Sequence, residues 1–475
     1  MSRTRIVCAV IVIVAVASVL FVRRAERIGA MPTASSATTV TASAAGPAPT
    51  SGEARELCLA DPGGESAIDL QIRTHAELPR RLPTKSDAWA RVGWDWVRKA
   101  RLSGDPGFYV HVDGCVDAAL GAAPGDPGAL ELRALVLMNG HRFADAERVS
   151  QEVLRSDPGN AVALGTLSDA LLEQGRFDEA VSAAQRRADV QPDSASYVRA
   201  SYFRWLVGDR EAAKRFIRSA LGGRDARDPE PTAWTFVEAA KIFWHEADYD
   251  GADAVLAEAL RWVPGYAPAL AARGRVALAR GDAERAVEDL TAALRVQPLP
   301  ETAWLLADAR EMLGDADGAR AEAERVVQLG RRGDRLTLAL FYATKNRDVD
   351  EALRLIEDER ASRGGVYVDD AYAWILYRAG RLTEARRASD RALRLGTPDA
   401  RLLYHAGAIR LKAGDAGGRA LVEKALALNP AFDRTGAAEA RKLLAEAAGS
   451  PASPAASTTA SRRARGIGNA RDARG

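Results

Sequence analysis

The chain is long, rich in apolar residues and close to neutral. It has 475 residues, of which 47% are hydrophobic, and 66 lysines and arginines against 64 aspartates and glutamates give a formal net charge of +2. This composition builds a large core and excludes a wholly disordered chain. The charge balance gives no reason to expect nucleic acid as a partner along the whole length. With three cysteines and no Cys-x-x-Cys pair, a zinc ribbon and a disulfide scaffold are excluded.

Residues 1–28 predict a transmembrane anchor or a signal peptide. An uncharged run of 17 residues, Ile6 to Val22, has arginines on both sides, and this length is at the short end of what crosses a bilayer core of about 30 Å. No small-residue cleavage site directly follows the run, so an uncleaved anchor is favoured over a cleaved signal. The arginines before and after the run nearly balance, so they leave the orientation open.

Residues 29–54 are rich in Ala, Ser, Thr and Pro, which predicts a flexible linker. Such a tether suits a folded part held outside the cytoplasm, in the cell envelope, or secreted if the signal is cleaved. In an oxidising compartment Cys58 and Cys115 either form a disulfide, which would join an N-terminal cap segment at residues 55–85 to the first helices, or remain buried thiols. Two cysteines carry no pattern that decides between these alternatives.

From residue 86 onward the sequence repeats with a period of 34 residues. Pro124, Pro158 and Pro192 have this spacing, as do Pro264 and Pro298, and each follows an apolar helical stretch that proline can end. A second series places an alanine five residues after a glycine, at Gly175/Ala180, Gly208/Ala213, Gly281/Ala286, Gly314/Ala319 and Gly380/Ala385. Glycine supplies a left-handed turn between two helices, and the small alanine lets those helices approach. The pattern predicts one antiparallel helix pair per unit.

Stretches such as residues 167–192 (LSDALLEQGRFDEAVSAAQRRADVQP) resemble tetratricopeptide repeats in the places of the glycine, the aromatic residue, the alanines and the proline. The resemblance implies an all-α fold, a right-handed solenoid of helix-turn-helix repeats over residues 86–448. About ten units are expected, at residues 86–124, 125–158, 159–192, 193–222, 231–264, 265–298, 299–330, 331–362, 364–398 and 399–430. The unit at 331–362 lacks the turn glycine and has Arg347 in its frame.

Beyond these units, a final helix at about residues 435–447 has the polar outer face of a solenoid cap. The basic segment at residues 449–475 is expected to be a disordered tail, because it is rich in Ala, Ser, Pro and Arg.

No catalytic motif accompanies the repeats. No lysine follows a glycine, which excludes a phosphate-binding loop, and neither HExxH nor GxSxG is present. The five histidines are dispersed without metal-ligand spacing. Residues 53–85 are too few for a catalytic domain. We therefore expect a protein that is not an enzyme and uses neither a cofactor nor a metal.

The resemblance further implies that the first helix of each repeat lines an inner groove, at places about thirteen, ten, six and three residues before the turn glycine. Those places hold aromatic and charged side chains: Tyr202, Trp205, Trp234, Lys241, Trp244, Arg275, Trp304, Phe341, Tyr367, Trp374, Tyr377 and Tyr404. Aromatic anchors interleaved with charges suit a groove for an extended peptide or a helix. For each ring the alternative is packing between neighbouring first helices.

The sequence therefore predicts a membrane-tethered scaffold or adaptor that binds a protein or peptide in its concave groove. Two alternatives stay open. In one, a cytoplasm-facing regulator contacts nucleic acid or an anionic membrane through its arginine-rich tail, which has five arginines and one aspartate after residue 460. In the other, the chain is a scaffold subunit of an envelope enzyme assembly whose chemistry lies in another chain.

Overall fold

The computed structural model describes residues 51–449, and within this range the chain is helical throughout, with no strand. The all-helical architecture predicted from the sequence is confirmed. The predicted anchor or signal at residues 1–28, most of the linker at 29–54 and the basic tail lie outside the described residues. No helix in the range 51–449 is both long enough and apolar enough to cross a bilayer.

Twenty-three α-helices and one short 3-10 helix follow one another along the described part of the chain. They are α2 (Ser51–Cys58), α3 (Ala67–Arg81), α4 (Ser86–Ser103), η1 (Pro106–Phe108), α5 (Tyr109–Ala122), α6 (Pro127–Asn139), α7 (Phe143–Ser156), α8 (Ala161–Glu173), α9 (Phe177–Val190), α10 (Ser194–Leu206), α11 (Arg210–Ala220), α12 (Pro229–His245), α13 (Tyr249–Trp262), α14 (Ala267–Arg280), α15 (Ala283–Val296), α16 (Pro300–Met312), α17 (Ala316–Arg332), α18 (Arg335–Thr344), α19 (Val349–Arg360), α20 (Val366–Arg378), α21 (Leu382–Ala392), α22 (Ala400–Lys412), α23 (Gly417–Leu428) and α24 (Arg434–Gly449).

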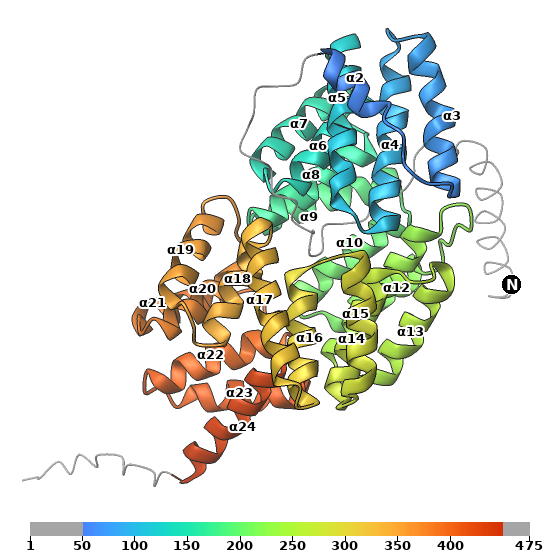
Figure 1. Cartoon of the computed structure of the whole chain (residues 1–475). Helices are drawn as coiled ribbons and strands as arrows, with labels where there is room; N and C mark the ends of the chain where they lie inside the picture. Colours follow the sequence, from blue (N-terminus) through green and yellow to red (C-terminus); the bar gives the residue numbers. More distant parts are fainter. Residues whose placement is uncertain (1–50, 450–475) are drawn as a thin grey trace, which may run out of the picture.

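From α4 to α23 these helices form consecutive antiparallel pairs, α4/α5 to α22/α23, and α24 follows the last pair (Figure 1). Within a pair the two helices pack on each other, and the first helix of a pair also contacts the first helix of the next pair, as α4 contacts α6 and α12 contacts α14. The helices thus stack as a solenoid in which each unit buries its apolar face against its neighbours.

The turn inside each repeat depends on one residue with a left-handed backbone. The five predicted turn glycines, at positions 175, 208, 281, 314 and 380, have φ angles between 76° and 81°. Where glycine is missing, His141, Ala247 and Asn346 adopt φ angles of 55°, 59° and 49°. In the unit at 331–362 the repeat frame places Arg347 at the turn, but the left-handed residues are its two neighbours, Asn346 and Asp348. Asparagine tolerates this conformation better than most residues because its short polar side chain bonds locally.

Alanine near the start of most second helices lets the paired helices approach closely. Ala180, Ala213, Ala286 and Ala385 are all fully buried against the first helix of their own repeat. A larger side chain at these places would overpack the contact between the two helices. The glycine–alanine spacing in the sequence thus corresponds to a physical contact in every one of these repeats.

A disulfide joins Cys58, at the end of α2, to Cys115 in α5, and their Cα atoms are 4.5 Å apart. The indole Nε1 of Trp96 donates a hydrogen bond to the Cys58 carbonyl oxygen at 2.9 Å, and the Trp96 ring is fully buried. The structure thus has the bridged form of the two alternatives. The bridge fastens the cap segment, α2 and α3, to the first repeat.

We predict that Cys58 and Cys115 resist thiol labelling in unfolded protein until a reductant is added. Because the bridge closes a loop with a sequence separation of 57, the chain-entropy account assigns it about 4 kcal/mol of stabilisation, so the Cys58→Ser/Cys115→Ser variant should unfold at clearly lower temperature. Labelling in denaturant followed by mass spectrometry measures the first effect and thermal unfolding the second. Quantitative labelling of both thiols before reduction would contradict the bridge.

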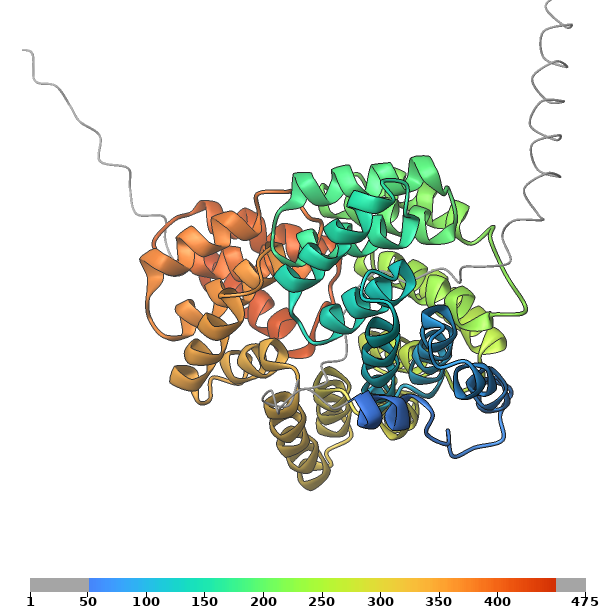
Figure 2. The same cartoon turned by 90° about the horizontal axis from the view of Figure 1, so that it is seen from above.

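The solenoid curls until its C-terminal repeats touch repeats three and four (Figure 2). The Gly364 amide donates to the Glu173 carbonyl at 2.8 Å, and the Thr397 hydroxyl donates to the Leu206 carbonyl at 2.7 Å. A Cβ atom on Gly364 would lie 2.8 Å from the Gln174 carbonyl oxygen, so only glycine fits this approach of two backbones. The contact closes the helices around a shared interior.

Candidate functional site

A cavity of about 870 Å³ occupies the interior of the curled solenoid. First helices of the repeats supply most of its wall, from α4 through α22. The segment from Asn429 to Arg441, which includes the start of α24, also lines it. This space is called the central cavity below. Its volume lies in the range of small-molecule and cofactor sites, about 300–1,000 Å³.

Eight of the twelve side chains predicted for the groove line the central cavity. They are Tyr202, Trp205, Trp234, Lys241, Trp244, Arg275, Trp304 and Tyr367. Five of the rings, those at 202, 234, 244, 304 and 367, are only partly buried, so their faces are accessible from the cavity. They come from four first helices, α10, α12, α16 and α20, which together contribute apolar surface to one space.

Trp244 has an unused hydrogen-bond donor in this wall. Its indole Nε1 is buried and has no partner among the described residues. Arg275 places its guanidinium over the Trp244 ring, 5.2 Å from the centroid, and the same guanidinium pairs with Glu301. The buried donor is left without an acceptor in this part of the chain, which costs free energy.

The charges of the cavity wall are mostly arranged as pairs. Lys241 Nζ lies 2.7 Å from Glu238, and Arg363 lies 2.7 Å from Glu173. Asp169 receives two hydrogen bonds from the buried Arg199, at 3.0 and 2.8 Å. These pairs hold carboxylates and cations at fixed places around the aromatic rings. The wall therefore offers apolar contact and directional polar contact together.

His245 lies at the end of α12 between the cavity and the contact that closes the solenoid. Its ring packs against Trp205 with centroids 4.8 Å apart, and its Nδ1 is 3.7 Å from the Asp399 carboxylate. Burial lowers the pKa of His245 from 6.5 to about 4, although Asp399 acts in the opposite direction. The imidazole is therefore neutral at pH 7.

We predict that His245 makes the protein less stable in acid. The folded state resists protonation down to about pH 4, whereas the unfolded imidazole takes up a proton near 6.5. The stabilisation is complete above pH 6.5 and is lost as the pH falls through about 4, which corresponds to about 3 kcal/mol at most. Urea unfolding at pH 7 and pH 4.5 should show a smaller pH dependence in His245→Gln than in the parent.

The variant must be compared with the parent, because a second group also changes stability over this pH range. Burial raises the pKa of Asp308 to about 6. The Asp308 carboxyl stabilises the folded state at pH values below its ordinary pKa of 3.8, and this stabilisation is lost as the pH rises through about 6. Its effect on stability therefore has the opposite pH dependence to that of His245. An identical pH dependence in parent and variant would show that His245 accepts a proton equally well in both states.

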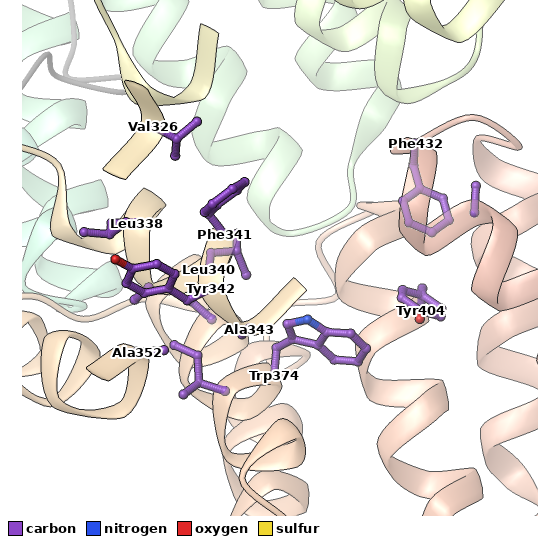
Figure 3. Close-up of a cluster of buried hydrophobic side chains, with 14 of the residues drawn as sticks. Val326, Leu338, Leu340, Phe341, Tyr342, Ala343, Ala352, Trp374, Tyr404 and Phe432 are labelled. Carbon is purple, nitrogen blue, oxygen red and sulfur yellow. The ribbon is translucent and has the colours of Figure 1, made fainter. Parts of the chain in front are cut away.

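Four of the predicted groove residues do not line the cavity: Phe341, Trp374, Tyr377 and Tyr404. Three of them, Phe341, Trp374 and Tyr404, are each 1% exposed, which corresponds to the alternative of packing between neighbouring helices. Figure 3 shows these rings in the largest buried cluster, together with Phe432. Tyr377 is half-buried and stacks on Trp374 with centroids 5.0 Å apart. The rings pack here because α22 and the start of α24 cover α20.

The sequence also missed part of the wall. His245 lies on a first helix, but outside the four places that the repeat frame marks, and Glu301 occupies the place thirteen residues before Gly314 but is not among the predicted groove residues. Arg401 and the residues from Asn429 onward reach the cavity only because the last repeats fold back over it. A repeat pattern describes neighbours in the chain and carries no signal for a contact between distant repeats.

Comparison with known sequences agrees with the helix pairs. Residues 137–201 and residues 271–334 each match the tetratricopeptide repeat family. The chain is also 30% identical over 186 residues to cellulose synthase operon protein C of Pseudomonas fluorescens (strain SBW25), a match that covers 37% of this chain and 14% of that protein. The chain thus corresponds to a small part of the length of this relative.

Several solved structures are similar to this chain at low identity. PilW, described as a widely conserved type IV pilus biogenesis factor, is 17% identical, with a TM-score of 0.36 over 43% of this chain and 92% of its own. The human IFIT1 dimer with PPP-AAAA is 13% identical, with a TM-score of 0.45 over 79% of this chain and 94% of its own. At these values the similarity carries no argument about function. The helix pairs, the left-handed turns and the two matched segments together show that the chain contains tetratricopeptide repeats.

Proposed function

We propose that the protein is a non-catalytic scaffold that binds a segment of another protein in the central cavity. The observation that carries the proposal is the set of partly buried aromatic rings from four first helices that face one space. Aromatic residues dominate the binding energy of protein interfaces, because they bury a large area at a small cost in side-chain entropy. Paired charges between the rings would orient the bound segment.

The proposed place of action is the cell envelope, with residues 1–28 as a membrane anchor and the solenoid outside the cytoplasm. The uncharged run from Ile6 to Val22 between arginines supports this. The Cys58–Cys115 disulfide supports it independently, since structural disulfides persist in oxidising compartments and are rare in the cytoplasm.

The first step of the test is to identify the partner by crosslinking it from a residue of the central cavity. A photo-crosslinking amino acid replaces Trp304, which lines the cavity, or Val181, which is exposed on α9 outside it. Crosslinking is carried out on the full chain in its native membrane. A protein crosslinked from position 304 and not from position 181 supports the proposal, and a set of products common to both positions contradicts it.

We predict that Trp244→Ala then lowers the affinity for that partner by about thirtyfold, the loss typical of a hot-spot side chain of about 2 kcal/mol. Isothermal titration calorimetry measures the affinity, and thermal unfolding shows whether the variant stays folded. Trp262→Ala is the matched control, because Trp262 belongs to the same repeat and the same apolar cluster but does not line the cavity. Equal affinity losses in the two variants would contradict binding in the cavity.

A further inference from the structure

The C-terminal end of α3 and the turn after it form an exposed surface that is both apolar and basic. Residues 78–85 read Leu-Pro-Arg-Arg-Leu-Pro-Thr-Lys and contain no acidic residue. Leu78 is 40% exposed and Leu82 is 44% exposed, and Arg80, Arg81 and Lys85 are exposed beside them. These five side chains are called the α3 edge below.

The apolar part of the α3 edge is unusual within this molecule. Nine large apolar side chains are exposed in the described part of the chain, and three of them, at positions 70, 78 and 82, belong to α3 and its C-cap. α3 packs against α4 and lies at the outer edge of the N-terminal end of the solenoid (Figure 1). Leucines at this edge are therefore available for contact with something outside the fold.

The α3 edge also lies close to the point where the chain enters the structure from residues 1–50. The Arg80 guanidinium donates a hydrogen bond to the Leu59 carbonyl at 3.2 Å, directly after the end of α2. Leu59 is eight positions after Ser51, the first residue of α2. At the rise of an α-helix this corresponds to a distance of about 12 Å. The apolar run from Ile6 to Val22 ends 29 positions before Ser51.

We propose that the α3 edge rests on the surface of an anionic lipid bilayer, with Leu78 and Leu82 in the interface and Arg81 and Lys85 among acidic headgroups. Interfacial segments combine apolar side chains with Lys and Arg in this way. The contact orients the first repeat toward the membrane and holds the later repeats away from it. The inference rests on the membrane tethering in the proposed function and is independent of what the central cavity binds.

The basic side chains of the α3 edge lead us to expect a preference for anionic lipids. Arg80 is paired with Glu77 at 3.0 Å, which leaves Arg81 and Lys85 as the side chains with most net charge to offer. A basic residue near an anionic membrane surface contributes about fivefold to partitioning. Arg81→Gln/Lys85→Gln should therefore weaken the contact by about twentyfold or more without changing the fold, because both side chains are exposed.

The experiment places a probe at the α3 edge of the full-length protein. Cys8→Ser removes the cysteine outside the disulfide, and Leu82→Cys is labelled with an environment-sensitive fluorophore without reductant. The matched control is Leu313→Cys, because Leu313 is 45% exposed and is the C-cap residue of α16, in a later repeat. Both proteins are reconstituted into vesicles of phosphatidylcholine and phosphatidylglycerol whose acyl chains carry bromine, which quenches fluorophores at the interface.

The expected result is strong quenching and a blue shift at position 82 and neither at position 313. Omitting phosphatidylglycerol, or adding Arg81→Gln/Lys85→Gln, should restore the fluorescence at position 82 while the protein still floats with the vesicles. Flotation with equal quenching at both positions, or with none at position 82, overturns the inference and leaves the tethering intact. Protein that does not float overturns both the inference and the tethering.

Discussion

Trp374→Ala should lower the free energy of unfolding by about 3–5 kcal/mol, the cost of removing a buried aromatic ring from a packed core. The ring is 1% exposed. It stacks on His405 with centroids 4.1 Å apart, contacts Tyr377 and Tyr404, and lies under the Arg378 guanidinium at 4.6 Å. Its removal opens a void between α20 and α22, so thermal unfolding should begin in the last repeats.

Hydrogen exchange followed by mass spectrometry gives this test its spatial resolution, because repeats open in local units. Faster exchange should appear in α20 and α22 before it appears in α12. The matched comparison is Trp304→Ala, since the Trp304 ring is half-buried in the cavity wall. If Trp304→Ala destabilises the protein as strongly as Trp374→Ala, the distinction between a cavity ring and a core ring is wrong.

Asp169→Ala should destabilise the protein by a similar amount, about 3–5 kcal/mol, because it leaves a buried guanidinium without its counter-ion. Arg199 is 2% exposed, and its Nε and Nη2 atoms both bond to the Asp169 carboxylate. The pair joins α8 to α10 in the wall of the central cavity. Chemical denaturation of the parent and the variant measures the loss.

Two further variants distinguish the loss of the buried Asp169–Arg199 pair from a general effect of removing a charge. Arg320→Ala removes one partner of the exposed Arg320–Asp317 pair, whose side chains are 67% and 90% exposed, and should change stability by less than about 1 kcal/mol. Asp169→Leu/Arg199→Met removes both buried charges and should be more stable than Asp169→Ala alone, because no charge remains unpaired. A double variant less stable than Asp169→Ala would refute this account.

Much of the fold could be predicted from the sequence because a solenoid consists of contacts between near neighbours in the chain. Gly175, Gly208 and Gly380 take the left-handed backbone that the repeat frame requires. Ala180 and Ala385 are buried where close helix contact requires a small side chain. Each of these features depends on residues within one or two repeats, and a period of 34 residues is enough to reveal it.

Which aromatic residues face the central cavity could not be predicted from the same frame. The place six residues before the turn holds Tyr202 and Lys241 in the cavity wall, but Phe341 and Trp374 in the buried core. The repeat frame treats these places as equivalent. They differ because Trp374 packs against Tyr404 and His405 of α22 and Phe341 packs against Trp304, whereas nothing in the described part of the chain fills the space beside the earlier rings.

The sequence by itself determined the helix pairs, their turns and their order, since local backbone preferences and a short-range apolar pattern specify them. Only the tertiary structure decided that the solenoid closes. The Gly364–Glu173 and Thr397–Leu206 hydrogen bonds join residues that are 191 positions apart. Such contacts arise from the summed curvature of many repeats, and no periodic signal in the chain encodes that sum. The central cavity exists because of this closure.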